Sequence, residues 1–399
     1  MKILVDSLSS KGSNRIVIFS TILAVSFLPQ GFAQAVNSFK SSNLTVHGNT
    51  FVEHIAMSTK SSKGPRQWGS IASSADGTHL IAAENFGNLV TSSNSGLTWI
   101  DRTSAGARNW NSVASSSDGS KLVAVVGSDT GTPGASGGEI YTSTDFGATW
   151  TARTSAGNRW WCSVTMSSDG THIAATISAS AKVVGTGATR KKVIIGTDIF
   201  TSTDSGATWT DQTGSSPQNW GPITSNSDGT HLAAAVAYNG DIFTSSDSGA
   251  TWIDQASSGH HNWMSIASSS DGTHLVATSD DGPGGDIFTS ADSGATWTDQ
   301  SSAGSRYWGG VSSSSNGKKL AAVVNTGYLY TSSDYGVTWT ARKSAGAQGW
   351  NDIASSSDGT KLAAVPHSGK DGATGPRADV HTSSNSGASW IDQTSSSNR

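Results

Sequence analysis

The sequence has little charge, almost no cysteine and little proline. Of its 399 residues, 14% are charged, one is cysteine and 8 are proline. A single thiol excludes a disulfide scaffold and a four-cysteine zinc site. The formal net charge of −4 gives no positive field of the kind that nonspecific binding to nucleic acid or to an anionic membrane requires. We therefore expect no nucleic-acid partner.

Long apolar runs are also scarce. The longest, residues 16–28, follows Lys2, Lys11 and Arg15 and precedes Ala33-Gln34-Ala35, which is the arrangement of a secretory signal peptide. No later stretch approaches the roughly 20 apolar residues of a membrane helix. The sequence thus predicts cleavage near Ala35, secretion to an extracellular or periplasmic space, and a mature chain without a membrane span. Cleavage leaves 22 basic and 28 acidic side chains, a net charge of −6.

Tryptophan and glycine, in contrast, are abundant, with 15 and 46 copies. Chains that stay unfolded are poor in aromatic residues, so this chain is expected to fold. The tryptophans mark a tandem repeat, and a repeat of 42 to 60 residues decides the fold. Each unit opens with a motif of the form W-x-x-[IV]-x-S-x-S-[DN]-G-x-[HK]-[LI]. We place the seven opening tryptophans at Trp68, Trp110, Trp160, Trp220, Trp263, Trp308 and Trp350, which leaves Trp161 outside the pattern.

Each unit also contains a second motif, S-x-[DN]-x-G-x-[TS]-W, here called the box. Its acidic or amide residue is Asn94, Asp145, Asp204, Asp247, Asp292, Asp334 or Asn385. Short β-compatible runs such as 70–74, 232–236 and 241–245 flank the Asp-Gly turn and the box, and no run keeps a helical period. Each unit therefore predicts four antiparallel strands.

Four-stranded units of this length are typical of propeller blades. The last unit keeps its box intact, whereas an open stack of repeats requires an atypical cap. We predict an all-β chain in which residues 68–399 form a closed seven-bladed β-propeller of four-stranded antiparallel blades. It follows a signal peptide at 1–35 and an extension at 36–67, in which residues 51–57 are an extra strand that clasps the ring.

The box resembles the Asp-box, or BNR repeat, of sialidases, some β-glucan hydrolases, sortilin-type receptors and photosystem II assembly factors. The resemblance covers residues 68–399 and implies a structural hairpin between the third and fourth strands of each blade. A short acidic or amide side chain can accept backbone N–H bonds within such a turn, and glycine tolerates positive φ. Because Asn94 and Asn385 replace the carboxylate in two units, we interpret the boxes as architecture, with no catalytic residue, metal or cofactor.

Chain order predicts two distinct faces. The Asp-Gly turns and the boxes lie on one, here called the turn face. The links between blades and the loops between second and third strands lie on the other, the loop face, together with the long insertions at 127–138, 178–197, 279–285 and 366–378. Function often lies in variable loops on a rigid frame. We select as candidate binding residues Arg66, Arg108, Arg159, Arg306, Trp110, Trp160, Trp263, Trp308, Arg190, Lys191 and Lys192.

Two interpretations of these residues stay open. The arginines form a positive rim that steers an anionic glycan or an acidic protein surface, and the tryptophans stack on sugars. Alternatively, the arginines pack beside aromatic rings and the tryptophans belong to the core. A surface Ca²⁺ at Asp280, Asp281 and Asp286 is a further hypothesis, and Cys162 is expected to be a small buried residue.

The leading functional hypothesis is a secreted, monomeric, non-enzymatic scaffold that binds a protein or a surface glycan through its loop face. A glycan-cleaving hydrolase of the Asp-box type is the alternative. It is weakened because a sialidase-like Arg-Ile-Pro segment is missing from the mature sequence, whose only glutamates are Glu53, Glu84 and Glu139. A protein like the photosystem II assembly factors is the third hypothesis.

Overall fold

A computed structural model describes residues 66–127, 137–178, 198–212, 218–282, 284–367 and 380–393, and the backbone of 180–184 and 191–195. These residues belong to one unit, Ser62–Arg399. The predicted signal peptide and the predicted clasp strand at 51–57 lie outside the described residues. Every regular element within them is a β-strand or a three-residue 3₁₀ helix, as the sequence predicts.

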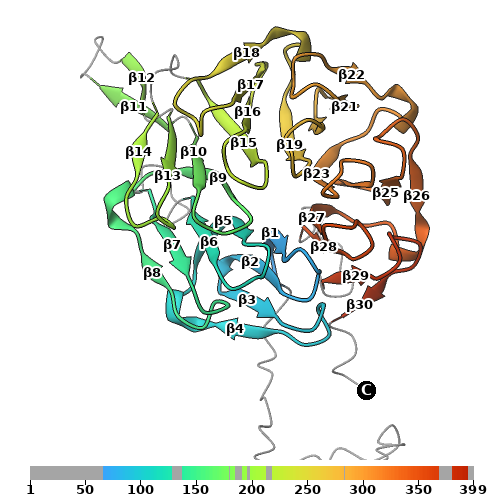
Figure 1. Ribbon diagram of the computed structural model, residues 1–399, viewed down its shortest axis with the longest axis horizontal. Coiled ribbons are helices and arrows are strands. Elements are labelled where there is room, and N and C mark those ends of the chain that lie inside the picture. The colour runs from blue at the N-terminus through green and yellow to red at the C-terminus, as the bar shows by residue number, and fades with distance from the viewer. Residues whose placement is uncertain are drawn as a thin grey trace, which may run out of the picture. The chain divides into compact units, whose positions relative to one another are not determined.

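The described strands form seven four-stranded antiparallel blades in a ring, which confirms the predicted propeller (Figure 1). Blades 1 to 4 are β1 (Trp68–Ser73), β2 (Leu80–Gly87), β3 (Leu89–Ser92) and β4 (Ile100–Arg102); β5 (Arg108–Ser115), β6 (Leu122–Val126), β7 (Ile140–Ser143) and β8 (Thr151–Ala152); β9 (Trp161–Met166), β10 (Ile173–Ile177), β13 (Ile199–Ser202) and β14 (Thr210–Asp211); and β15 (Trp220–Ser225), β16 (Leu232–Val236), β17 (Ile242–Ser245) and β18 (Ile253–Gln255). A two-stranded ribbon of β11 (Ser180–Val184) and β12 (Lys191–Ile195) is inserted into blade 3.

Blades 5 to 7 repeat the same order. They are β19 (Trp263–Ser268), β20 (Leu275–Ser279), β21 (Ile287–Ser290) and β22 (Thr298–Asp299); β23 (Trp308–Ser313), β24 (Leu320–Val324), β25 (Leu329–Ser332) and β26 (Thr340–Arg342); and β27 (Trp350–Ser355), β28 (Leu362–Pro366), β29 (His381–Ser383) and β30 (Ile391–Asp392). The first strand of each blade is innermost, and β1 lies beside both β5 and β27.

Backbone hydrogen bonds between neighbouring Asp-Gly turns close the ring. In each turn, the N–H of one residue donates to the carbonyl oxygen of the equivalent residue in the next blade, at 2.7–2.9 Å. The donors are Ala75, Ser117, Ser168, Ser227, Ser270, Ser315 and Ser357. Ser357 donates back to Ala75 at 2.7 Å, so seven bonds form one uninterrupted circle. This circle excludes an open stack of repeats.

Seven apolar clusters, one at each junction between blades, form the core. In the junction of blades 1 and 2, Trp110 and Leu122 pack against Ile81 and Leu89. An equivalent cluster around Trp68 joins blade 7 to blade 1. Each junction buries its own tryptophan, so the core consists of seven separate clusters arranged around the ring. Smaller side chains lie at the ring axis itself.

The opening tryptophan of blade 3 is Trp161, and the prediction of Trp160 was wrong. Trp161 begins β9, pairs with Ile177 and is fully buried, whereas Trp160 precedes the strand and is half-buried. The sequence carried the correct signal, because Val164 stands three residues after Trp161 just as Ile71 stands three residues after Trp68. Trp160 stands directly before Trp161, so the residue type alone does not distinguish the two positions.

The boxes are tight hairpins held by their own side chains. In blade 4, Oδ1 of Asp247 accepts from the hydroxyl of Ser245 and from the N–H of Thr251, both at 2.8 Å. Its Oδ2 accepts from the Thr251 hydroxyl at 2.6 Å. In the asparagine boxes the direction of this last bond reverses, since Nδ2 of Asn94 donates to the Thr98 hydroxyl at 2.9 Å. A hydroxyl can both donate and accept, which explains why an amide can replace the carboxylate here.

We predict that Asp334→Ala destabilises the protein by about 1–3 kcal/mol, because it leaves the Thr338 N–H and the hydroxyls of Ser332 and Thr338 without their acceptor. Asp334→Asn is the matched control and is expected to cost much less, as the boxes of blades 1 and 7 already carry asparagine. Urea unfolding followed by tryptophan fluorescence measures both. Equal losses for the two variants would show that the turn needs the charge itself.

The Asp-Gly turns contain carboxylates with strongly lowered pKa values. Hydrogen bonds from the Ser116 hydroxyl and from the N–H and hydroxyl of Ser120 lower the pKa of Asp118 to about 2. The same pattern lowers the pKa of Asp169, Asp271 and Asp358 to about 2. Each carboxylate therefore stabilises the fold when ionised.

This pattern predicts a loss of stability in acid. A carboxyl group whose pKa is about 2 in the fold and about 4 in the unfolded chain contributes its full stabilisation above pH 4, and loses it as the pH falls toward 2. The urea midpoint should therefore fall steeply across this window, because several such groups titrate together. A midpoint that stays constant from pH 4.5 to 2.5 would contradict the prediction.

Candidate ligand site at the axis of the loop face

The innermost strands of the seven blades converge at the ring axis (Figure 1). A pocket of about 390 Å³ opens there, lined by residues of all seven blades. Its wall consists mainly of the two residues that follow each opening tryptophan, namely Gly69, Ser70, Asn111, Ser112, Cys162, Ser163, Gly221, Pro222, Met264, Ser265, Gly309, Gly310, Asn351 and Asp352. Tyr238 and Asn325, from loops between second and third strands, place the pocket on the loop face.

Serine hydroxyls in this wall join successive blades. Ser112 Oγ accepts from the N–H of Val164 at 3.2 Å, and Ser265 Oγ accepts from the N–H of Val311 at 3.1 Å. Ser70 and Ser163 make equivalent but longer bonds of 3.4 Å. Small polar residues fit this position because the strands crowd together near the axis.

Asp352 takes the place of these serines in blade 7. Its Oδ2 accepts from the N–H of Ile71 in blade 1 at 2.9 Å, and its Oδ1 accepts from the N–H of Ile353 at 2.9 Å. A Cβ at Gly310 in blade 6 would lie only 2.5 Å from Oδ1, so the carboxylate requires glycine opposite. Burial raises the pKa of Asp352, although these hydrogen bonds oppose the shift. Among the described residues of the wall, it is the only acidic or basic residue.

Cys162 also belongs to this wall. It is half-buried, so the expectation of a buried apolar residue holds only in part. Burial raises the pKa of its thiol, which disfavours the thiolate that a nucleophile requires. The pocket therefore offers hydroxyls, amides and one carboxylate, without an activated cysteine.

The four predicted arginines pack on aromatic rings, as in the second of the two interpretations. The guanidinium of Arg159 lies 4.4 Å from the ring centre of Phe200, and those of Arg108 and Arg306 lie 4.9 and 4.8 Å from Tyr141 and Tyr330. Arg66 lies over Trp68 and forms an ion pair with Asp101 at 2.8 Å. Blade packing thus accounts for these side chains, which are two positions before the opening tryptophans.

Three of the four predicted tryptophans are buried, although Trp263 also contributes to the lining of the axial pocket. Trp110, Trp263 and Trp308 are 0–2% exposed and form core clusters, so their rings are not open for stacking on a sugar. Trp160 is half-buried beside the start of β9. Of the predicted basic insertion, Arg190 lies outside the described residues, and the structure describes only the backbone of Lys191 and Lys192, in β12.

Histidines and aspartates meet where blades 4 and 5 adjoin on the loop face. His261 Nδ1 lies 2.6 Å from Asp281, and His260 Nδ1 lies 3.1 Å from Asp241. Asp281 also accepts from the N–H of Asn262 at 2.7 Å. These internal bonds occupy the carboxylate of the hypothetical Ca²⁺ loop, and no three described side chains of suitable type converge to hold a metal ion.

Carboxylates lie in pairs in blades 3, 4 and 5. Burial and the neighbouring Asp211 raise the pKa of Asp198 in blade 3. Burial and Asp254 raise the pKa of Asp241 in blade 4, and burial and Asp286 raise the pKa of Asp299 in blade 5. In each pair, one carboxylate stands directly before the third strand of the blade and the other lies in the fourth strand. Arg159 lies near Asp198, and His260 and His261 lie near Asp241, so positive or ionisable groups of the same face accompany these pairs.

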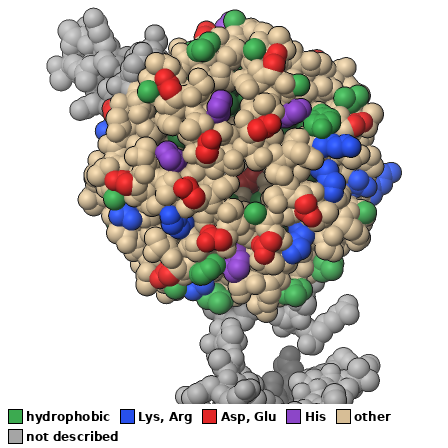
Figure 2. All heavy atoms as spheres, in the orientation of Figure 1, with side chains coloured by type: hydrophobic (Ala, Val, Ile, Leu, Met, Phe, Trp, Pro, Cys, Tyr) green, Lys and Arg blue, Asp and Glu red, His purple; other side chains and the backbone are tan. Residues whose placement is uncertain are grey.

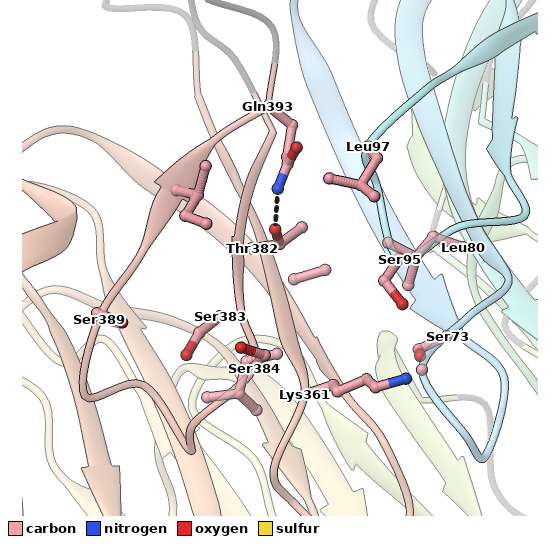
Figure 3. Close-up of a pocket in the computed structure, with 14 residues that line it drawn as sticks. Ser73, Leu80, Ser95, Leu97, Lys361, Thr382, Ser383, Ser384, Ser389 and Gln393 are labelled. Atoms are coloured by element: carbon pink, nitrogen blue, oxygen red, sulfur yellow. Dashed lines mark hydrogen bonds between the residues drawn. The ribbon is translucent and has the colours of Figure 1, made fainter. Parts of the chain in front are cut away.

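A second cavity, of about 190 Å³, lies where blade 7 meets blade 1 (Figure 3). Lys361 points from blade 7 toward Ser73, and Gln393 donates to the hydroxyl of Thr382 beside it. Cavities with equivalent linings, of about 80 and 310 Å³, lie at the junctions of blades 4 and 5 and of blades 5 and 6. The repetition marks this cavity as a consequence of blade packing.

Histidines on the turn face serve the same packing. Figure 2 shows histidine and carboxylate side chains spaced around a central hollow. The ring of His79 lies 4.8 Å from that of Phe146, and the ring of His274 lies 4.8 Å from that of Tyr335, each in the box of the next blade. Lys319 occupies an equivalent position and reaches Ser386 of the next box at 3.3 Å. Lysine and histidine are interchangeable here because both bridge two blades.

Comparisons with known proteins support the fold. No family model and no curated protein match the chain. Among solved structures, the GH74 xyloglucanase from Xanthomonas campestris is similar, with 14% identity and a TM-score of 0.62 over 83% of this chain and 55% of that one. YCF48 from Cyanidioschyzon merolae matches at 16% identity and a TM-score of 0.55, over 80% of this chain and 96% of that one.

A structure of YCF48 bound to a D1 peptide matches at 14% identity and a TM-score of 0.54, over 75% of this chain and 90% of that one. This chain spans about half the length of the xyloglucanase. At such low identities the similarity shows the β-propeller fold alone, and the relation to Asp-box proteins stays a resemblance. No helix in the described residues is long and apolar enough to cross a membrane.

The axial pocket was not predicted from the sequence, in which the rim and the insertions of variable length were the candidate regions for ligand recognition. The pocket wall belongs to the most regular part of the repeat, and the signal within it is one residue, Asp352, at a position where four other blades have serine.

Proposed function

We propose that this protein is a secreted, non-enzymatic binding propeller that recognises a protein or a surface glycan on its loop face. The axial pocket carries the proposal. It opens on the face with the variable loops, all seven blades contribute to it, and its wall offers neutral hydrogen-bonding groups around one carboxylate. A site of this kind suits recognition, because a concave surface with a few fixed polar groups orients a ligand.

Two exposed side chains extend this surface. Tyr238 is 75% exposed and Met264 is 45% exposed, and both line the pocket. Aromatic and methionine side chains are favoured where a partner binds, because they offer a large contact area. One structure of YCF48 is bound to a D1 peptide, and the GH74 protein, of which this chain matches 55%, is a xyloglucanase; both support peptides and glycans as ligand classes to test.

The test is a glycan array and a peptide array probed with the mature chain and two variants. Met264→Trp fills the axial pocket from an exposed position. Val337→Trp is the matched control, since Val337 is 57% exposed in the box of blade 6 on the turn face. We expect binding that Met264→Trp abolishes and Val337→Trp preserves. Binding that neither substitution affects, or no binding on either array, would contradict the proposal.

Hydrolysis of a glycan is the second candidate. The paired carboxylates of blades 3 to 5 favour it, because a protonated carboxyl group beside an ionised one is the arrangement of glycosidases. Their recurrence in three blades instead favours architecture. Release of reducing sugar from xyloglucan or a sialoside, abolished by Asp241→Asn and retained by Asp358→Asn, would establish hydrolysis. If sugar is released from neither substrate, hydrolysis is contradicted and the binding function remains the proposal.

A further inference from the structure

We infer that the axial pocket binds a lysine side chain of a protein partner, with its ammonium group on Asp352. This inference rests on the proposed function and names the ligand chemistry of the same site. Asp352 is half-buried in the wall of an open pocket, and no described Lys, Arg or His lies within ion-pair distance of it.

The ring does not need a charge at this position. Ser112 and Ser265 make the same hydrogen bond to the next blade with a hydroxyl, at 3.2 and 3.1 Å. Asp352 makes it at 2.9 Å to Ile71 with a carboxyl group, and none of the ion pairs among the described residues gives that group a counter-ion. Removing a charge from water is costly unless a partner compensates it. A cation from outside the chain would supply that compensation.

The geometry favours lysine over arginine. Each oxygen of Asp352 already accepts one backbone N–H at 2.9 Å, from Ile71 and from Ile353, and the Ser70 hydroxyl also bonds to this carboxyl group. A guanidinium binds best when both oxygens are available to its planar fork. A lysine ammonium is a compact charge with three donors, so it can bind one remaining acceptor position of the carboxylate and use other hydroxyls of the pocket wall for its remaining donors.

The pocket also suits the lysine stem and a basic partner. Met264 and Ala237 supply apolar wall against which the methylene groups can pack. The expected mature charge of −6 favours the approach of a basic protein. A side chain with a long stem reaches a carboxylate in the wall while its own backbone stays outside, which the amine of a sugar ring cannot do as easily.

Methyl NMR of the full chain tests the inference. The sequence has four methionines, and Met264→Leu assigns the signal of the one in the pocket. The probes are the blocked peptide acetyl-Gly-Lys-Gly-amide and its glutamine counterpart. We expect the lysine peptide to shift the Met264 signal saturably without moving that of Met166, and the glutamine peptide to bind at least about tenfold more weakly.

Three variants locate the charge. Asp352→Asn and Asp352→Ser are expected to weaken binding of the lysine peptide at least about tenfold. The serine variant restores the residue found in four other blades, so the junction with blade 1 should persist. Asp358→Asn removes the same charge from the same blade on the turn face, and should leave binding unchanged. Thermal unfolding confirms that each variant is folded.

The failure of this inference is distinct from that of the proposed function. If an array ligand binds in a way that Met264→Trp blocks, but the lysine peptide leaves the Met264 signal unmoved, lysine recognition is wrong and the binding function stands. Binding of the lysine peptide that Asp352→Asn and Asp352→Ser do not weaken also overturns it. Lysine recognition is also wrong if a glucosamine oligomer binds, loses binding on Asp352→Asn, and the lysine peptide does not bind.

Discussion

Alanine in place of Trp161 is expected to destabilise the protein by about 3–5 kcal/mol, whereas alanine in place of Trp160 should cost about 1 kcal/mol or less. The two residues are adjacent and identical in type, so the difference measures position alone. Trp161 is fully buried, with its ring centre 5.5 Å from that of Phe200 and 6.3 Å from that of Trp209. Its removal leaves a cavity at the junction of blades 2 and 3.

Urea unfolding of the two variants gives the comparison directly. The indole nitrogen of Trp161 has no hydrogen-bond partner in the described structure, so the expected loss comes from packing. Trp161→Phe should therefore recover part of it. If Trp160→Ala is instead the more damaging variant, the register of β9 is shifted by one residue and Trp160 opens the blade.

Alanine in place of Gly294 is expected to cost about 2–4 kcal/mol, more than at most surface turns. Gly294 belongs to the box of blade 5 and has a φ of +91°, which L-residues rarely adopt. A Cβ at this position would also lie 2.8 Å from Cγ2 of Thr244 in the preceding blade. Backbone strain and a steric clash therefore add together.

Gly346→Ala is the matched control for Gly294→Ala. Gly346 has a φ of +80°, but a Cβ there would meet nothing within 4 Å, so only the strain of about 1–2 kcal/mol is expected. Adding Thr244→Ser to Gly294→Ala removes the clashing methyl group and keeps the hydroxyl that accepts from Gln255. Chemical unfolding of the four proteins in the double-mutant cycle should show partial recovery. Equal losses at Gly294 and Gly346 would show that blade contact contributes nothing.

The two parts of the candidate site differ in how far the sequence predicts them. The arginines two positions before the opening tryptophans are visible in the sequence, but their partners Tyr141, Phe200 and Tyr330 lie on strands 33, 41 and 24 residues away, as the cation–π contacts show. A rim of free charge and a set of stacked guanidinium groups have the same sequence pattern. Only the contact distances distinguish them.

The sequence alone determined the all-β class, the four-stranded unit and the number of blades. These follow from local signals, namely turn residues, alternating short strands and a regularly spaced tryptophan, which recur seven times and correct one another. Tertiary structure alone decided what happens where the blades meet. The circle of hydrogen bonds from Ala75 to Ser357, the burial of the opening tryptophans and the position of Asp352 in an open axial pocket all depend on contacts between units far apart in the chain. A repeat specifies its own strands, but the surface that its copies form together exists only once the ring has closed.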